Sequence, residues 1–326
     1  MLFHGILEYP FWKQSARLRR NNLELKFDSD KLFRVQNENI QNPDYIEPIQ
    51  QKPEKKPDAA LAPTPNNPPW NSGTAFLTWL LSVIFIIFIP SFFLIPYILQ
   101  SGINLNDSAQ LAEMAQNDPT AILFQMVGII PAHILTFIAA WLVVTNFNKH
   151  SFFKTIGWEW GGFNVWYCIV ITIAFFILGM VLTLIFGEQD HELQRILRSS
   201  RAVVYVVAFM ATFTAPIVEE LIYRGILFSA FQRTVGVVWA VVVVTFLFAS
   251  VHFWQYQSSP VALLLILALS LVLTLIRAKT GNLLPSFALH TVFNGLQALF
   301  MILQPILPEI PAQTEEKTAF IFRLFN

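Results

Sequence analysis

Seven long apolar runs follow Pro69 and leave few alternatives for the fold of this chain. A helix needs ~20 apolar residues to cross the ~30 Å hydrocarbon layer of a bilayer. Soluble helices of that length would show a polar stripe at the 3.6-residue period. Apart from Glu219 and the terminal Arg277, the runs contain no Asp, Glu, Lys or Arg. The predicted spans cover residues 74–99, 121–145, 164–187, 202–219, 237–254, 260–277 and 283–305.

The sequence therefore predicts an all-α fold, a polytopic transmembrane helical bundle of about seven to eight helices with a polar, partly disordered N-terminal extension. Residues 1–72 hold 10 of the 21 basic and 9 of the 21 acidic residues. We expect residues 1–40 to form a small polar module without an assigned role. Residues 41–72, rich in Pro, Asn, Gln and Lys, are predicted to be a linker. The transmembrane domain is predicted over residues 73–306 and a C-terminal tail over residues 307–326.

The charge balance and the cysteine count limit which ligands and cross-links the chain can have. Lys plus Arg and Asp plus Glu each total 21, so no global basic field favours binding to nucleic acid. The lipid bilayer is the expected partner. Cys168 is the single cysteine, which excludes an internal disulfide and a cysteine-based zinc site. A metal ion could be held only by His and carboxylate side chains.

The distribution of basic residues predicts an integral, multi-pass protein of the cell (inner) membrane with a cytoplasmic N-terminus. The first 20 residues lack the apolar segment of a signal peptide. The loop at 100–120 has three acidic residues and no basic one, whereas the loop at 188–201 opposes the trend with three arginines. The basic residues assigned to the inner side are Lys52, Lys55, Lys56, Lys149, Lys154, Arg224, Arg233, Arg277 and Lys279.

Ionisable side chains inside apolar spans are costly and therefore indicate functional sites. Glu220 and Arg224 are four residues apart, with the acid first, which favours an ion pair on a helix. Glu219 points about 100° away from that pair, so we expect it to face another neighbour. A boundary cluster at the lipid headgroups is the alternative interpretation of this segment.

Three histidines also lie in apolar runs. Phe248 and His252 are one helical turn apart, and His290 and Asn294 repeat that spacing. Either pair alone is also typical of packing between membrane helices. His133 has no polar neighbour at helical spacing, which favours a packing role.

Chain geometry predicts that two of these sites meet. If the helices of Glu219 and His252 form an antiparallel pair that turns at Val235 and Gly236, each residue lies about 16 positions from the turn. The two side chains would then share one depth, and the glutamate helix would continue to about Phe231. A glutamate beside a histidine can take a proton from water, and a facing His and Asn can donate hydrogen bonds to an oxyanion. This chemistry is that of a peptide hydrolase.

The segments EELIYRG (219–225), FASVH (248–252) and HTVFN (290–294) resemble the EExxxR, FxxxH and HxxxN motifs of the CAAX-prenyl-protease and bacteriocin-processing (Abi) family of intramembrane endopeptidases. The resemblance covers a core at about residues 200–295. It implies that Glu219 and His252 activate water and that His290 and Asn294 stabilise the oxyanion. It also implies that Glu220 and Arg224, with Phe248 of the second motif, support the site.

Hydrolysis of a membrane-associated, prenylated or leader peptide without a cofactor is the predicted function. Two alternatives stay open. One is a zinc-dependent intramembrane metallopeptidase whose metal is held by Glu219, His252 and His290, although the sequence lacks HExxH. The other is a non-catalytic membrane scaffold or a proton-coupled transporter.

Overall fold

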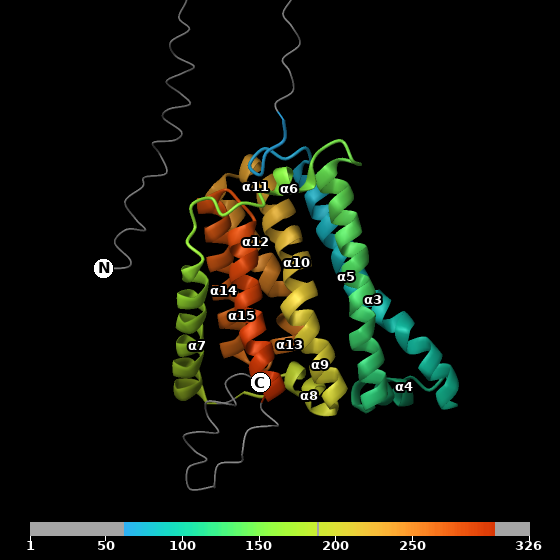
Figure 1. Ribbon diagram of the computed structural model, residues 1–326. Helices are drawn as coiled ribbons and strands as arrows, with labels where there is room; N and C mark the ends of the chain where they lie inside the picture. Colours follow the sequence, from blue (N-terminus) through green and yellow to red (C-terminus); the bar gives the residue numbers. More distant parts are fainter. Residues whose placement is uncertain (1–61, 188, 304–326) are drawn as a thin grey trace, which may run out of the picture. The chain divides into compact units, whose positions relative to one another are not determined.

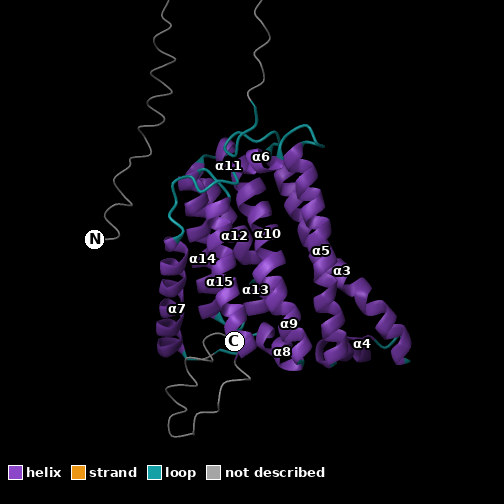
Figure 2. Ribbon diagram, in the orientation of Figure 1, coloured by secondary structure: helices purple, strands orange, loops and turns teal. Residues whose placement is uncertain are grey.

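The computed structural model describes residues 62–187 and 189–303. Every described residue belongs to one compact unit of the chain. The predicted N-terminal module, most of the predicted linker and the predicted C-terminal tail lie outside the described residues. Within the described residues the structure is helical, as Figure 2 shows, with one isolated β-bridge between Thr64 and Asn67.

Six described helices are long and apolar enough to cross a membrane. One of them is an uninterrupted helical span over Arg201–Thr234 that carries both glutamates. The predicted run at 202–219 was therefore too short, whereas the expected continuation of this helix to about Phe231 is confirmed by its end at Thr234. The other five are α3 (Ser72–Ser101), α5 (Pro119–Thr145), α7 (Trp166–Phe186), α14 (Pro260–Thr280) and α15 (Leu284–Leu303).

The predicted run at 237–254 forms a shorter helix than expected. Helix α12 covers Val237–Val251, and a separate turn of helix, α13, covers Phe253–Tyr256. The prediction of one helix over 237–254 was wrong because the chain turns at His252, whose backbone N–H bonds to Ala249 O. The predicted turn before α12 is confirmed, since Gly236 has a positive φ of 82°, a conformation that glycine adopts without steric cost.

The long Arg201–Thr234 span is not a uniform α-helix. It consists of α9 (Arg201–Phe209), the π-helical turn η2 (Met210–Thr214), α10 (Ala215–Glu219), the π-helix η3 (Glu220–Leu227) and α11 (Phe228–Thr234). In η2 the Ala215 N–H bonds to Met210 O, and in η3 the Phe228 N–H bonds to Tyr223 O. Such five-residue spacings widen a helix and often occur at functional sites.

Short helices lie at both ends of the bundle (Figure 1). Helix α6 (Phe152–Ile156) lies at the same end as α11. Helices α4 (Ser108–Asn117) and α8 (Glu192–Ser199) lie at the opposite end. Hydropathy did not predict them, because each is too short or too polar to span a bilayer.

Residues 62–71, near the end of the predicted linker, pack on the α11 end of the bundle. Trp70, only 6% exposed, donates its indole N–H to Ile226 O over 3.1 Å. Arg277 is fully buried and donates to Pro65 O and to Asn66 Oδ1. These contacts tie residues 62–71 to α14 and to η3.

The outer faces of the long helices are apolar. Ile87 and Phe92 on α3 and Ile177 and Ile185 on α7 each expose more than half of their side-chain surface. A monomeric soluble protein rarely exposes contiguous apolar surface on this scale. Together with the six long apolar helices, this identifies an integral, multi-pass membrane protein.

Candidate active site

The ion pair predicted between Glu220 and Arg224 is present and completely buried. Arg224 Nη1 lies 2.9 Å from Glu220 Oε1, and both side chains have no exposed surface. The guanidinium also donates to Ser270 Oγ over 2.8 Å and to Thr274 Oγ1 over 3.3 Å. A buried charge needs such partners to offset its desolvation.

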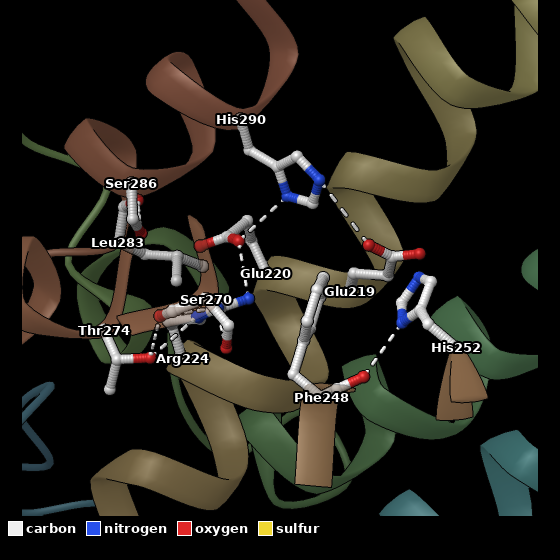
Figure 3. Close-up of polar contacts among 10 residues, drawn as sticks. All are labelled: Glu219, Glu220, Arg224, Phe248, His252, Ser270, Thr274, Leu283, Ser286 and His290. Carbon is white, nitrogen blue, oxygen red and sulfur yellow. Dashed lines mark hydrogen bonds and ion pairs between the residues drawn. The ribbon is translucent and has the colours of Figure 1, made fainter. Parts of the chain in front are cut away.

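His290 lies between the two glutamates (Figure 3). Its Nδ1 is 3.0 Å from Glu220 Oε1, and its Nε2 is 3.6 Å from Glu219 Oε2. Glu219 faces away from Arg224, as predicted, but both glutamates share this histidine as a neighbour. Carboxylates accept hydrogen bonds and do not donate them, so His290 Nδ1 is the donor in its 3.0 Å contact with Glu220 Oε1. The other nitrogen of the ring is left facing Glu219.

His252 presents one free nitrogen toward Glu219. Its Nδ1 lies 2.8 Å from Phe248 O. Because a carbonyl can only accept, Nδ1 carries the proton and Nε2 of the neutral ring has a free lone pair. Figure 3 shows the ring turned toward the Glu219 carboxylate, whose side chain keeps 22% of its surface exposed. This orientation accords with the predicted proximity of Glu219 and His252.

The Phe248 ring packs among the charged and histidine side chains of the site. Its ring lies under the Arg224 guanidinium at 4.6 Å, which is within the range of a cation–π contact. It also packs on the rings of His252 at 4.8 Å and His290 at 6.0 Å. The aromatic residue predicted to support the site therefore touches both histidines.

Asn294 contacts the backbone of η2. Its Nδ2 donates to Ala211 O over 3.0 Å. In the π pattern, the N–H of residue 216 would bond to this carbonyl, but Pro216 has no N–H. Asn294 thus satisfies a carbonyl that the proline leaves without a helical partner, and it retains one amide hydrogen. Its position near the glutamate helix agrees with the expected site, and this backbone contact was not predicted.

Three further residues lie near Glu219. His133 of α5, expected to serve packing, contacts Thr214 in η2 over 2.8 Å. Its ring and the hydroxyls of Tyr223 and Tyr256 interact with the Glu219 charge. For Tyr256, which follows His252 in α13, burial and then the Glu219 charge raise the pKa of the phenol above its usual range.

The residues of the zinc alternative are not gathered as a set of metal ligands in the described part of the chain. Within the described ranges, no group of three or more His, Cys, Asp or Glu side chains is placed to hold a metal ion. His290 faces a carboxylate with each of its two nitrogens.

Several residues of the site could not be predicted from the sequence. Ser270 and Thr274 come from α14 and complete the partners of Arg224, but hydroxyl residues are common in apolar helices, where they bond to their own helix. Pro216, by contrast, could have indicated from the sequence that the helix is irregular near the glutamates. A proline inside an apolar span marks a break in the helical hydrogen bonds.

Comparison with known families agrees with this geometry. Residues 201–296 match the family described as type II CAAX prenyl endopeptidase Rce1-like. These residues are similar to an Rce1-like domain. The matched segment begins at the start of α9 and ends in α15, so it includes both glutamates, His252, His290 and Asn294. The match indicates a membrane-embedded protease, and thus a hydrolase. No curated protein and no solved structure shows significant similarity to the chain.

Proposed function

We propose that the protein is an intramembrane endopeptidase that hydrolyses a peptide bond with water activated by Glu219 and His252. The free Nε2 of His252, fixed by the Phe248 carbonyl, is the observation that carries this proposal. The Glu219 carboxylate and the His252 Nε2 are two acceptors, and the His252 ring is turned toward the carboxylate (Figure 3). A water molecule that donates one hydrogen to each keeps its lone pairs free to attack a carbonyl carbon.

The proposed reaction passes one proton through Glu219. The carboxylate takes a proton from the attacking water, and the resulting hydroxide adds to the peptide carbonyl. Protonated Glu219 then gives this proton to the leaving amine as the C–N bond breaks, so that the products are a carboxylic acid and an amine. Transfer of the proton to the amine leaves Glu219 a carboxylate again, ready for the next cycle, and the acid product releases its own proton to solvent.

The oxyanion that forms on the carbonyl needs hydrogen-bond donors. His290 Nε2 lies 3.6 Å from Glu219, which is too long for a firm hydrogen bond. In this proposal His290 carries a proton on each ring nitrogen. When Glu219 takes up its own proton, its attraction for the Nε2–H falls, and this N–H is free to bind the oxyanion. The remaining amide hydrogen of Asn294 is the second donor in this proposal.

The proposed substrate is a membrane-associated peptide, either a prenylated C-terminus of CAAX type, as the Rce1-like family description suggests, or a leader peptide. Glu220 and Arg224 support the site, and no metal or other cofactor takes part. We also propose that the protein lies in the cell membrane with its N-terminus in the cytoplasm. Lys149, Lys154 and Arg233 lie at or beside the helix ends that face residues 62–71, in accord with the positive-inside rule.

A comparison of newly formed peptide termini in membranes tests this function without knowledge of the substrate. Membranes of cells that express the wild type should contain new termini that are missing with Glu219→Gln, which keeps the shape and removes the base. Cleavage should fall by a factor on the order of 10² or more, while the variant accumulates normally. Cleavage should persist in 1,10-phenanthroline. Identical termini with both proteins would refute the proposal, and loss of cleavage in the chelator with recovery in zinc would refute the metal-free mechanism.

A further inference from the structure

Tyr223 is a buried residue of the glutamate helix that the proposed reaction does not use. It lies in η3, four residues after Glu219, and its side chain is only 5% exposed. Its hydroxyl lies 3.1 Å from the indole Nε1 of Trp79 in α3. An indole N–H can only donate, so the phenol oxygen accepts this bond. Tyr223 therefore joins the helix of the proposed base to a helix outside the matched residues 201–296.

The ring of Tyr223 packs on Phe248 of α12. The two rings meet edge to face, with their centroids 5.0 Å apart and their planes at 73°, which is a geometry that aromatic pairs prefer. Phe248 is only 2% exposed, so its ring depends on such neighbours for its position. The hydrogen bond to Trp79 holds the far end of the Tyr223 side chain and thus fixes the ring that supports Phe248.

Phe248 in turn determines how His252 is presented to Glu219. Its carbonyl accepts the His252 Nδ1–H over 2.8 Å, which leaves Nε2 as an acceptor. Its ring packs against the His252 ring at 4.8 Å, with the planes 30° apart (Figure 3), and limits the rotation of the imidazole. Each step from Trp79 to His252 is a direct contact. The influence of Tyr223 on His252 therefore passes through the Phe248 ring.

We propose that Tyr223 is a positioning residue of the hydrolytic site: its ring, tethered by Trp79, holds the Phe248 ring against His252 and so keeps Nε2 directed at the attacking water. This proposal rests on the proposed activation of water by Glu219 and His252. Tyr223 does not contact the substrate in this arrangement. Its removal should therefore lower the turnover rate and leave substrate binding unchanged.

The test uses the purified full-length protein in detergent and a peptide that spans the membrane cleavage site with the strongest dependence on Glu219. With Tyr223→Leu, kcat should fall about tenfold, the upper end of what one edge-to-face aromatic contact contributes, and KM should stay the same. Tyr223→Phe keeps the ring and loses one hydrogen bond, so kcat should fall only about threefold. Trp79→Phe breaks the same hydrogen bond and should match Tyr223→Phe.

The dependence on Phe248 separates positioning from a general loss of stability. In the Phe248→Leu background, Tyr223→Leu should cause no further loss of kcat, because the ring that it supports is already absent. Phe175→Leu is the matched control, since buried Phe175 on α7 also forms an edge-to-face pair, with Phe293 at 5.8 Å. Its kcat should equal that of the wild type. All variants are assayed as monodisperse fractions from gel filtration, which removes unfolded protein.

Four results would overturn the positioning role: a normal kcat for Tyr223→Leu, equal losses for the Leu and Phe variants, a change in KM alone, or a further loss in the Phe248→Leu background. If Tyr223→Leu does not fold, Trp79→Phe decides, because a threefold loss of kcat supports the proposal and a normal kcat overturns it. Normal cleavage by Glu219→Gln would instead overturn the proposed function, and this inference with it.

Discussion

Two arginines are completely buried in the bundle, and their surroundings differ. Arg224 pairs with the carboxylate of Glu220. Arg277 is held by Asn66, Ser229 and the carbonyl of Pro65, without a carboxylate among its described partners. Arg277 lies in the last turn of α14, where the negative end of the helix dipole favours a cation. Arg224 lies inside its helical span and depends on Glu220 for charge balance.

The dependence of Arg224 on Glu220 predicts a loss of folded protein. Glu220→Gln can still accept a hydrogen bond from Arg224 but leaves its buried charge unbalanced, at a cost of about 3–5 kcal/mol of folding free energy. We expect the variant to accumulate poorly in the membrane and to lose activity. Adding Arg224→Met should restore part of the protein, measured by immunoblot of membranes. Glu192→Gln, which breaks an exposed pair with Arg195, should accumulate normally. A double variant no more abundant than the single one would contradict this account.

Sequence spacing predicted the composition of the site but not all of its contacts. The i, i+4 spacing predicted the ion pair between Glu220 and Arg224. The equal sequence separations of Glu219 and His252 from the turn at Gly236 predicted that these two residues lie at one depth. Both predictions depend on helix geometry alone. The contact of His290 with both glutamates was not predicted, since it depends on how α15 packs against a π-helix. The contact of His133 with Thr214 was also missed, because spacing within one helix carries no information on its neighbours.

At the scale of the helix, Pro216 and Asn294 form one structural unit. Asn294 donates to the Ala211 carbonyl that Pro216 leaves without a backbone partner. Pro216→Ala restores an N–H that can bond to this carbonyl. Asn294→Leu alone should destabilise the fold by about 1–3 kcal/mol through an orphaned carbonyl, and it should cost less in the Pro216→Ala background.

Thermal unfolding in detergent measures this coupling. The double variant should be more stable than the sum of the single effects predicts, by about 1 kcal/mol. Strictly additive effects of Pro216→Ala and Asn294→Leu would show that the two residues act independently. Activity is not the readout here, because Asn294 is also a proposed oxyanion donor.

Helix α8 begins at a histidine whose protonation should loosen it. His191 Nδ1 accepts from the Gln194 N–H, and the ring packs on Tyr256 at 4.8 Å. Burial lowers the pKa of His191, Asp190 opposes this shift, and Arg198 adds to it. Because the folded pKa lies below the unfolded value of 6.5, the stabilisation is complete above that pH and is lost as the pH falls through the folded pKa.

Hydrogen exchange of the α8 amides should therefore be faster at pH 5 than at pH 7.5, after correction for the intrinsic exchange rate. His191→Asn keeps an N-cap acceptor that does not titrate, so its protection should not change with pH. Equal pH dependence in both proteins would assign the effect to another group.

The whole bundle shows where hydropathy is sufficient and where it fails. Six predicted runs correspond to long helices, because a window of about 20 apolar residues has few other uses. The run at 237–254 was predicted too long, because its apolar composition continues through the turn at His252 into α13. The packing of residues 62–71 on the bundle was not predicted, because their composition is typical of a linker and the residues that they contact are distant in the sequence.

The proposed orientation makes a prediction for the complete protein in its membrane. The end that carries α4 should face outward, and the end that carries α6 should face the cytoplasm (Figure 1). In a Cys168→Ala background, a membrane-impermeant maleimide should label Asn117→Cys in intact cells. It should label Lys154→Cys only after the cells are opened. Both positions lie outside the six long helices, so neither replacement removes lipid-facing surface. Labelling of Lys154→Cys in intact cells, with protection of Asn117→Cys, would reverse the orientation and place the face that bears residues 62–71 outside the cell.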